Sequence, residues 1–276
     1  MSKRQLHWSH ISMFTKCPEQ YRRRYLEGEK FPPGAKAVTG TGVHLAAEID
    51  LTHKIVKGEL APEEQITEAA RDSVVHSFES DQGVYLTTDE EAVGVARVKA
   101  QAIDSVVRFA SIHHRELAPL ANPRQLERKW VLNVDGFPFN LAGTIDCDDG
   151  DVIWDWKTSG KTPSKYEAHD SGQVTVYSLA KYTLDKRMPT ARLGYVINTK
   201  VPKTVVLETR RTKAEFKPLI IAMERIANAI DKQVFTFAAW MTPRPWWCHP
   251  DWCGYYNTCP GVSRRVMTFT GDTSEK

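Results

Sequence analysis

A short stretch in the middle of the chain, residues 143–161, constrains the fold more than any other feature. It reads GTIDCDDGDVIWDWKTSGK: an apolar run ends at Asp146, an Asp-Gly turn follows, and a second apolar run carries Asp155 and Lys157. Two such runs joined by a tight turn predict a β-hairpin, with both carboxylates at the same end. Because side chains alternate along a strand, Asp155 and Lys157 share one face and Trp156 lies on the other.

Carboxylates that converge in this way bind hard divalent cations such as Mg²⁺. Two acids and a lysine around one metal ion form a common arrangement for cutting phosphodiester bonds. The alternative is a purely structural ion pair between Asp155 and Lys157, which is disfavoured because buried ion pairs contribute little to stability on average. The remaining acids of the stretch fall in the predicted turn, where Asp is expected on local grounds, so they are not predicted as ligands: Asp148, Asp149 and Asp151.

The order of predicted elements indicates an α/β fold with a central mixed β-sheet flanked by helices. Helical spacing of apolar residues predicts helices over about 9–16, 18–26, 40–57, 89–117, 166–184 and 212–239. Alternating residues predict strands over 126–134, 137–146, 152–157, 192–198 and 204–208.

The length of 276 residues suits one large domain, which we expect to span residues 1–260. Within it, residues 1–120 are mainly helical, 121–210 form the sheet core, and 211–260 form a helix followed by a cysteine-rich segment. Residues 261–276 form a polar tail whose composition allows disorder.

The overall charge is only mildly basic, with 37 Lys+Arg against 34 Asp+Glu, short of the profile of a pure nucleic-acid binder. No apolar run approaches the ~20 residues that span a bilayer, so no membrane partner is expected. The N-terminus MSKRQLHWSH lacks the apolar centre of a secretory signal. We therefore expect a cytoplasmic protein, in which cysteines serve as metal ligands or bystanders rather than in disulfides.

Four of the five cysteines lie near the two ends of the chain, at Cys17, Cys248, Cys253 and Cys259. Four thiolates suit either a tetrahedral zinc ion or an iron–sulfur cluster, and unmetallated buried cysteines are the third alternative. The spacing differs from the paired CxxC of zinc ribbons. The remaining Cys147 is predicted to be a small buried residue.

Three further residues could serve the acidic site. Gln173 and Tyr177 lie four apart on a predicted helix, hence on one face, and both can hydrogen-bond a phosphate or a base edge. His44 follows Gly40-Thr41-Gly42 at a predicted helix start. Imidazole is an acceptable ligand for Mn²⁺ and a less natural one for Mg²⁺, while a tyrosine or a lone histidine on a helix often serves packing instead.

Together these motifs resemble the PD-(D/E)xK nuclease superfamily, and more closely its RecB-like exonuclease branch. The matching pieces, in the family's order, are Gly42-Val43-His44, Gly143-Thr144-Ile145-Asp146, Asp155-Trp156-Lys157 and Gln173-x-x-x-Tyr177. The resemblance implies a restriction-endonuclease-like core. It implies that His44, Asp146 and Asp155 bind Mg²⁺ or Mn²⁺, with the Trp156 carbonyl as a further ligand. It also implies that Lys157 is catalytic and that Gln173 and Tyr177 position DNA. Glu48 and Glu127 are weaker candidates for supporting the site.

The distant Cys17 and the C-terminal trio resemble the iron–sulfur nucleases of the same branch, namely the AddB nuclease domain and the fourth CRISPR-associated exonuclease family. The resemblance implies that Cys17, Cys248, Cys253 and Cys259 hold a 4Fe-4S cluster, with zinc as the less favoured occupant. Such a cluster would link the first helices covalently to the end of the chain and so close a long loop of the polypeptide between Cys17 and Cys248.

We therefore expect a metal-dependent DNA exonuclease that hydrolyses phosphodiester bonds in recombination, repair or the processing of DNA ends. DNA is the expected partner, in the form of single strands or free ends. Tyr21, Arg22 and Tyr25 suit an entry path for a strand. The alternative is a non-catalytic or partner-dependent DNA-binding module of a recombination or CRISPR-adaptation complex. No GxxxxGK[ST] string is present, so the sequence predicts no helicase motor.

Overall fold

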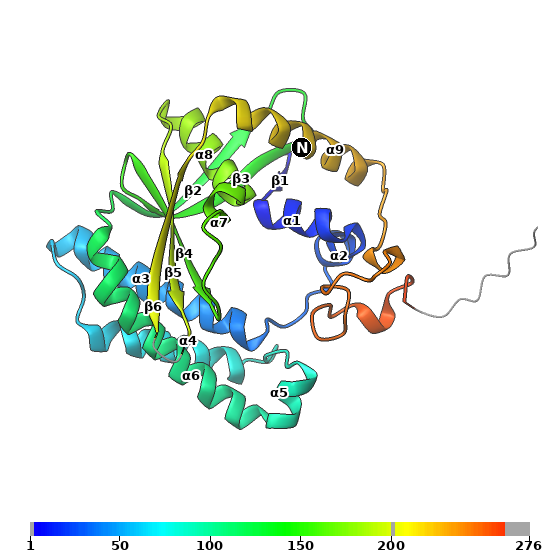
Figure 1. The fold of residues 1–276 in the computed structure, drawn as a ribbon. Coiled ribbons are helices and arrows are strands. Elements are labelled where there is room, and N and C mark those ends of the chain that lie inside the picture. Colours follow the sequence, from blue (N-terminus) through cyan, green and yellow to red (C-terminus); the bar gives the residue numbers. More distant parts are fainter. Residues whose placement is uncertain (1–2, 200–201, 263–276) are drawn as a thin grey trace, which may run out of the picture.

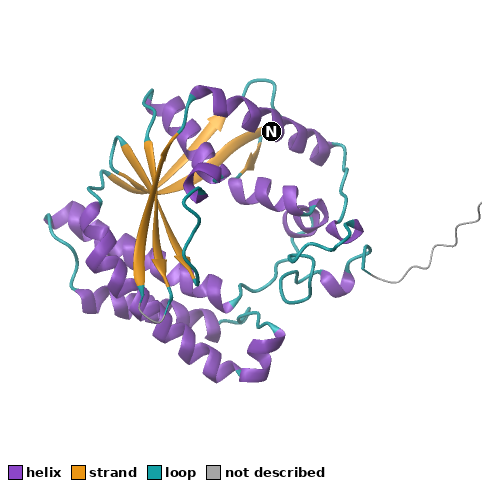
Figure 2. Cartoon of the chain, viewed as in Figure 1, coloured by secondary structure: helices purple, strands orange, loops and turns teal. Residues whose placement is uncertain are grey.

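The computed structural model describes residues 3–199 and 202–262, so the predicted tail lies outside the described residues from position 263 onward. A mixed six-stranded sheet forms the centre, and helices cover both of its faces (Figures 1 and 2). The predicted fold class is thereby confirmed.

The strands are β1 (Arg4–Leu6), β2 (Gln125–Asn133), β3 (Phe139–Asp148), β4 (Val152–Ser159), β5 (Thr190–Ile197) and β6 (Lys203–Arg210). The helices are α1 (Trp8–Lys16), α2 (Pro18–Tyr21), α3 (Ala35–Lys57), α4 (Glu63–Glu79), α5 (Thr88–Val93), α6 (Val95–Ile112), α7 (Glu167–Asp170), α8 (Gly172–Asp185) and α9 (Phe216–Asp231). Two π-helical turns, Arg22–Leu26 and His113–Leu117, extend α2 and α6.

Strand β3 pairs with three other strands of the sheet, β1, β2 and β4. It pairs with β2 in antiparallel fashion along most of its length, and with the short β1 in parallel. Its antiparallel pairing with β4 is confined to two residue pairs beside the turn, Cys147 with Trp154 and Asp148 with Ile153. Beyond those pairs β4 runs parallel to β5, which pairs antiparallel with β6. Asp146 and Asp155 therefore lie where the β3–β4 ladder stops.

Two hydrophobic cores lie on opposite faces of this sheet. The first is formed with α1, α8 and α9 and includes Leu6, Leu141 and Met223. The second is formed with α3, α4 and α6 and includes Trp154 and Trp156, whose rings stack at 5.0 Å. Ile153 belongs to the first core, so β4 has the alternation that the sequence predicts.

Helix α3 begins at Ala35, five residues earlier than predicted, directly after Pro32-Pro33-Gly34. Gly40-Thr41-Gly42 lies inside the helix rather than at its start. The glycine at position 42 serves packing: a Cβ there would lie 2.7 Å from Val106 Cγ2 and 3.0 Å from the Ala70 carbonyl oxygen. Its absence lets α3 approach α4 and α6 closely.

Two other predicted helices are shorter than expected, and one strand was missed. Gly94, with φ at 93°, separates α5 from α6 within the helix predicted over 89–117. Helix α9 ends at Asp231 because Gln233 takes a positive φ of 54° and Val-Phe-Thr-Phe follows, a β-favouring run. The three-residue β1 gave no periodic signal, and it is held by Leu6, which is 1% exposed.

A buried ion cluster fixes α8 to the sheet beneath the turn after β3. Both Asp148 oxygens accept from Lys181 Nζ at 2.7 Å, and Arg128 contacts Asp148 and Asp185. Lys181 also reaches Asp185 at 2.7 Å. Asp148 is only 2% exposed, so it belongs to the fold's interior and not to a solvated turn.

Replacing Asp148 by alanine is expected to destabilise the protein by about 3 kcal/mol, because Lys181 then lies buried with only Asp185 as partner. Urea unfolding measures this cost. The matched control is Asp151→Ala in the same turn, where the side chain is 80% exposed and its contact with Arg187 is long, at 3.4 Å. The control is expected to change stability by less than about 0.5 kcal/mol; equal effects of the two substitutions would contradict the assignment.

Candidate functional site

Asp146 sits at the break in the β3–β4 ladder and is held from two sides. Its Oδ2 accepts the Trp156 backbone N–H at 3.0 Å, and His44 Nδ1 lies 3.3 Å from the same oxygen. Burial raises the pKa of Asp146 to about 7, and the nearby negative charge of Asp155 adds to the shift. The carboxyl group is thus poised to lose its proton near neutral pH.

Asp155 and Lys157 project from β4 toward α8, as the alternation predicts. Lys157 Nζ lies 2.7 Å from Asp155 Oδ2, and Gln173 Nε2 donates to Asp155 Oδ1 at 3.0 Å. Asp155 Oδ2 is buried and has no hydrogen bond of acceptable angle, so its contact with the ammonium is an ion pair only. Of the groups described, only the Lys157 ammonium thus contacts this oxygen.

Gln173, on the face of α8 that is turned toward the sheet, contacts both Lys157 and Asp155. Its Oε1 accepts from Lys157 Nζ at 3.0 Å, and its Nε2 also donates to Tyr177 Oη at 2.8 Å. Burial raises the pKa of Tyr177, so its phenol stays protonated. The amide thereby fixes the positions of the ammonium and the Asp155 carboxylate relative to each other.

Sequence reasoning missed the residue that holds the loop before Gln173. Arg211, 3% exposed, donates to the backbone oxygens of Ala168, His169 and Ser171. Ser171 in turn caps α8 by accepting from the Val174 N–H. No local pattern marks Arg211, because its partners lie about 40 residues away along the chain.

His44 reaches the site from α3, on the other side of Asp146. Burial lowers its pKa, although the charge of Asp155 and a hydrogen bond to the Trp156 backbone oppose that shift. The imidazole is therefore neutral at pH 7, as a metal ligand must be. The Trp156 side chain lies in the second core, so only the backbone of this residue faces the site.

Glu127 lies across from Asp146, between the register pairs Leu126–Cys147 and Arg128–Ile145. Its φ of 44° is rare for a strand residue. Ile145 packs into the first core and Cys147 into the second, although residues two apart on a regular strand share a face. The backbone is thus distorted at Asp146, as strained residues often are at functional sites.

Glu127 lies near two other acidic side chains, Asp146 and Glu48. Burial raises its pKa, and the charges of Asp146 and Glu48 raise it further. Glu48 is on α3 one turn after His44, so both weaker candidates lie near the predicted site. Concentrated carboxylate oxygens and a neutral imidazole suit a divalent cation.

These donors fit a hard cation, and Asp155 Oδ2, which is buried without a hydrogen bond, supports that fit. Within residues 3–199 and 202–262, no three His, Cys, Asp or Glu side chains are already close enough together to hold a metal ion. Binding at the acids therefore requires these side chains to move closer together. An ion at Asp155 Oδ2 would take the place of the Lys157 ammonium, which has a second partner in Gln173.

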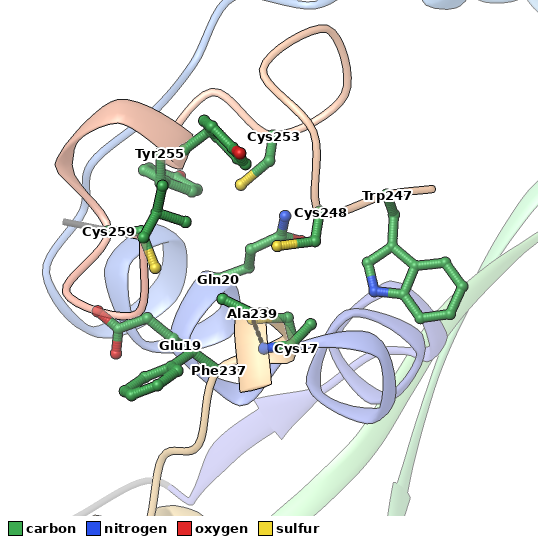
Figure 3. A pocket seen from close by; sticks show the side chains of 13 residues that line it. Cys17, Glu19, Gln20, Phe237, Ala239, Trp247, Cys248, Cys253, Tyr255 and Cys259 are labelled. Atoms are coloured by element: carbon green, nitrogen blue, oxygen red, sulfur yellow. Dashed lines mark hydrogen bonds between the residues drawn. The ribbon is translucent and has the colours of Figure 1, made fainter. Parts of the chain in front are cut away.

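The four terminal cysteines line one common pocket. Figure 3 shows the sulfur atoms of Cys248, Cys253 and Cys259 facing a common space beside Cys17. Cys17, at the junction of α1 and α2, accepts the Ala238 N–H at 3.4 Å. Burial raises the pKa of the Cys248 and Cys253 thiols, and the other cysteines raise it further.

Cys147, the fifth cysteine, and His249, which follows Cys248 in the sequence, both lie outside this pocket. Cys147 is fully buried against the second core, as predicted. His249 does not line the cysteine pocket; it contacts Asp251 at 3.3 Å. The chemistry of the pocket is therefore that of four thiols with apolar neighbours such as Phe237 and Trp247.

Comparison with known proteins gives one family model and several solved structures that match the chain. The model of the PD-(D/E)XK nuclease superfamily matches residues 6–260. A protein described as "Putative exonuclease" from Eubacterium rectale has 13% identity and a TM-score of 0.52, covering 86% of this chain and 85% of its own. The protein SSO0001 has 12% identity and a TM-score of 0.36, covering 95% and 89%. No curated protein matches the chain.

None of the helices within the described ranges combines the length and the apolar character that a bilayer crossing demands.

Proposed function

The chain belongs to the PD-(D/E)XK nuclease superfamily, and on that premise we propose that it is a metal-dependent deoxyribonuclease of the RecB-like branch that digests DNA from its ends. One observation carries the proposal. Asp146, Asp155, Lys157 and Gln173 come from three elements and meet where the β3–β4 ladder stops. A purely structural ion pair between Asp155 and Lys157 would not explain the distortion at Glu127 or the neighbouring acid Asp146 with its raised pKa.

Asp146, Asp155 and His44 are the proposed ligands of Mg²⁺ or Mn²⁺, with the Trp156 carbonyl as a further ligand. Such an ion, when bound, activates a water molecule and neutralises charge on the phosphate. The Trp156 N–H orients the Asp146 carboxylate, and the hydrogen bond between His44 and the Trp156 backbone orients the imidazole. The strand that carries Asp155 thus orients both of these side chains.

Lys157 supplies the positive charge of the site. Its side chain is 34% exposed, which leaves the ammonium accessible to a substrate phosphate. Gln173 Oε1 holds it near Asp155, where it can orient a water molecule or stabilise negative charge that develops on the phosphate. Tyr177 secures the Gln173 amide from the core side.

The activity is expected to rise with pH through about 7, because Asp146 must lose its proton before it binds metal. Since protons and metal compete, a tenfold rise in Mn²⁺ should move the midpoint to lower pH. The pH profile of kcat/KM at two Mn²⁺ concentrations measures this. A midpoint of the pH profile that does not change with the Mn²⁺ concentration would contradict the assignment of Asp146 as a metal ligand.

The same pKa shift has a consequence for the metal-free protein. The folded pKa of Asp146 lies above its usual value of 3.8, so folding favours the protonated acid. This contribution to stability is lost as the pH rises from about 4 through about 7. Bound metal should restore stability at high pH, which thermal unfolding with and without Mn²⁺ can detect.

We further propose that Cys17, Cys248, Cys253 and Cys259 hold a 4Fe-4S cluster with a structural role. Their common pocket and apolar neighbours support the proposal, since thiolates are the ligands of such clusters. The cluster would tie the junction of α1 and α2 to the C-terminal segment, which are more than 200 residues apart in sequence. Closing so long a loop stabilises a fold.

Digestion of end-labelled DNA in Mn²⁺ tests the function. Mononucleotides or short oligonucleotides released from one labelled end, and their absence when both ends are blocked, are the expected result. Internal cutting of blocked DNA would exclude the exonuclease. DNA binding without any hydrolysis would favour the non-catalytic or partner-dependent module within a recombination, repair or CRISPR-adaptation complex.

A further inference from the structure

The arrangement of the candidate site depends on how the Gln173 amide is held. Its oxygen accepts from Lys157 Nζ, and its nitrogen donates to Asp155 and to the Tyr177 phenol. Turning the amide over would place its NH₂ group against the ammonium and its oxygen against the carboxylate, so only one orientation fits. A shift of the backbone that carries Gln173 would likewise break these contacts.

Gln173 is the second residue of α8, so it lies in the part of a helix that is least restrained from within. The first N–H groups of a helix have no partners inside it, and helix ends fray. Ser171 caps the Val174 N–H at 3.3 Å, which is long for a hydrogen bond. The position of this first turn therefore depends on contacts with other parts of the chain.

Arg211 supplies such contacts from the end of β6. Its guanidinium donates to the Thr175 hydroxyl at 2.9 Å and to the Ser171 carbonyl at 3.0 Å. These two residues flank Gln173, each two positions away along the chain. The same guanidinium donates to two backbone carbonyls of α7, at 3.1 and 2.7 Å. Because the group is planar and its donors are fixed relative to one another, these contacts restrain both the position and the orientation of the first turn of α8.

The interior location of Arg211 indicates that these contacts do more than stabilise a loop. Burial of a guanidinium is costly unless a carboxylate lies close to it. Glu215 lies 3.6 Å away, and its side chain is 37% exposed. Burial accordingly lowers the pKa of Arg211. A charge that is buried at such a cost, mostly against neutral oxygens, is better explained by the geometry that it fixes than by stability.

A second element contacts the residue directly before Gln173. Helix α1 packs on α8, and its first residue, Trp8, lies against Gly172 (Figure 1). A Cβ at position 172 would lie 2.0 Å from Trp8 Cη2, so the indole packs directly on the backbone of α8. Contacts from α1 and from the end of β6 thus converge on residues 171–175.

We propose that Arg211 is a positioning residue of this site, an inference that rests on the proposed function. It fixes the first turn of α8 and thereby the Gln173 amide. Through that amide it keeps the Lys157 ammonium and the Asp155 carboxylate in the arrangement that hydrolysis needs. Arg211 acts only through α8, because its own hydrogen bonds go to residues 168–175 and 209.

DNA cleavage by the full chain in Mn²⁺, with Arg211→Lys alone and combined with Gln173→Ala, tests the proposal. Lysine keeps the charge but cannot make the same set of directed hydrogen bonds. We expect kcat to fall by between about tenfold and about 10²-fold, the loss that a displacement on the order of 1 Å causes. KM for DNA should stay unchanged, because the side chain is buried. In the Gln173→Ala chain the same substitution should lower kcat by less than about twofold, since the group through which it acts is gone.

Arg210→Lys is the matched control. Arg210 directly precedes Arg211, is exposed, and donates to the Met188 carbonyl over a long 3.4 Å. This variant should keep the wild-type kcat. Thermal unfolding of each variant separates a loss of folded protein from a loss of rate.

Thr175→Val is a milder second variant for the case that Arg211→Lys does not fold. It removes the hydroxyl that accepts from Arg211 Nε and changes the size of the side chain little. It should lower kcat by about threefold or more, again only while Gln173 is present. Thr183→Val in the last turn of α8 is its control, because the Thr183 hydroxyl is exposed and bonds only within the helix.

The proposal is overturned if the folded variants keep the wild-type kcat, or if the loss is as large in the Gln173→Ala chain as in the wild-type background. Either result would leave Arg211 a residue that stabilises the loop alone. A rise in KM at constant kcat would also overturn it. Failure of the proposed function is distinguishable, because Lys157→Ala would then cleave DNA as the wild type does; a wild-type chain without cleavage would overturn both.

Discussion

Alanine at position 157 or 146 is expected to slow DNA hydrolysis by a factor on the order of 10²–10³ or more. Lys157 is the proposed positive charge beside the substrate phosphate. Asp146 is the proposed metal ligand with the most strongly shifted pKa. Neither change should unfold the protein. The Lys157 side chain is partly exposed, and burial of the Asp146 carboxylate opposes folding at neutral pH.

Single-turnover rates on labelled DNA, together with thermal unfolding of each variant, measure this prediction. Lys217→Ala removes the same charge from an exposed site on α9 and should keep the full rate. Near-normal turnover by either Lys157→Ala or Asp146→Ala would show that the chemistry takes place elsewhere.

Cys253→Ala is expected to abolish the brown colour of the anaerobically purified protein and most of its solubility. Cys253 is 9% exposed and lines the cysteine pocket. Since metal binding contributes directly to folding in such sites, loss of one ligand should lower stability far more than loss of one buried thiol would. Iron and sulfide content, visible absorption and the soluble fraction are the measurements.

Cys147→Ala is the matched control, because Cys147 is even more buried than Cys253 but lies in the second core, outside the pocket. It should keep the colour and the iron content. Colourless wild-type protein that carries one zinc per chain would replace the cluster by a zinc site. Equal loss of colour in both variants would show that the effect is one of general destabilisation.

Local patterns were sufficient to predict the parts of the site that lie on one element. Strand alternation places Asp155 and Lys157 on one face, and helical spacing places Gln173 beside Tyr177. The mixed sheet with flanking helices likewise followed from the order of elements. The proximity of Cys17 to the C-terminal trio was expected only through the family resemblance.

The features that depend on contacts across the chain could not be predicted. Asp148 has the local signature of a turn residue, yet its partner Lys181 lies 33 residues away and makes it part of the interior. The distortion at Glu127 lies within the pairing of β2 with β3, and no local sequence pattern indicates it. Gly42 was misread as a helix start because its role depends on α4 and α6.

A crystal structure of the protein with bound Mn²⁺, located by anomalous scattering, tests the central claim most directly. The account predicts one ion bound by the carboxylates of Asp146 and Asp155, with Lys157 released from Asp155 Oδ2 and still in contact with Gln173. An ion bound elsewhere, or an acidic site without manganese in which the Asp155–Lys157 ion pair persists, would contradict it.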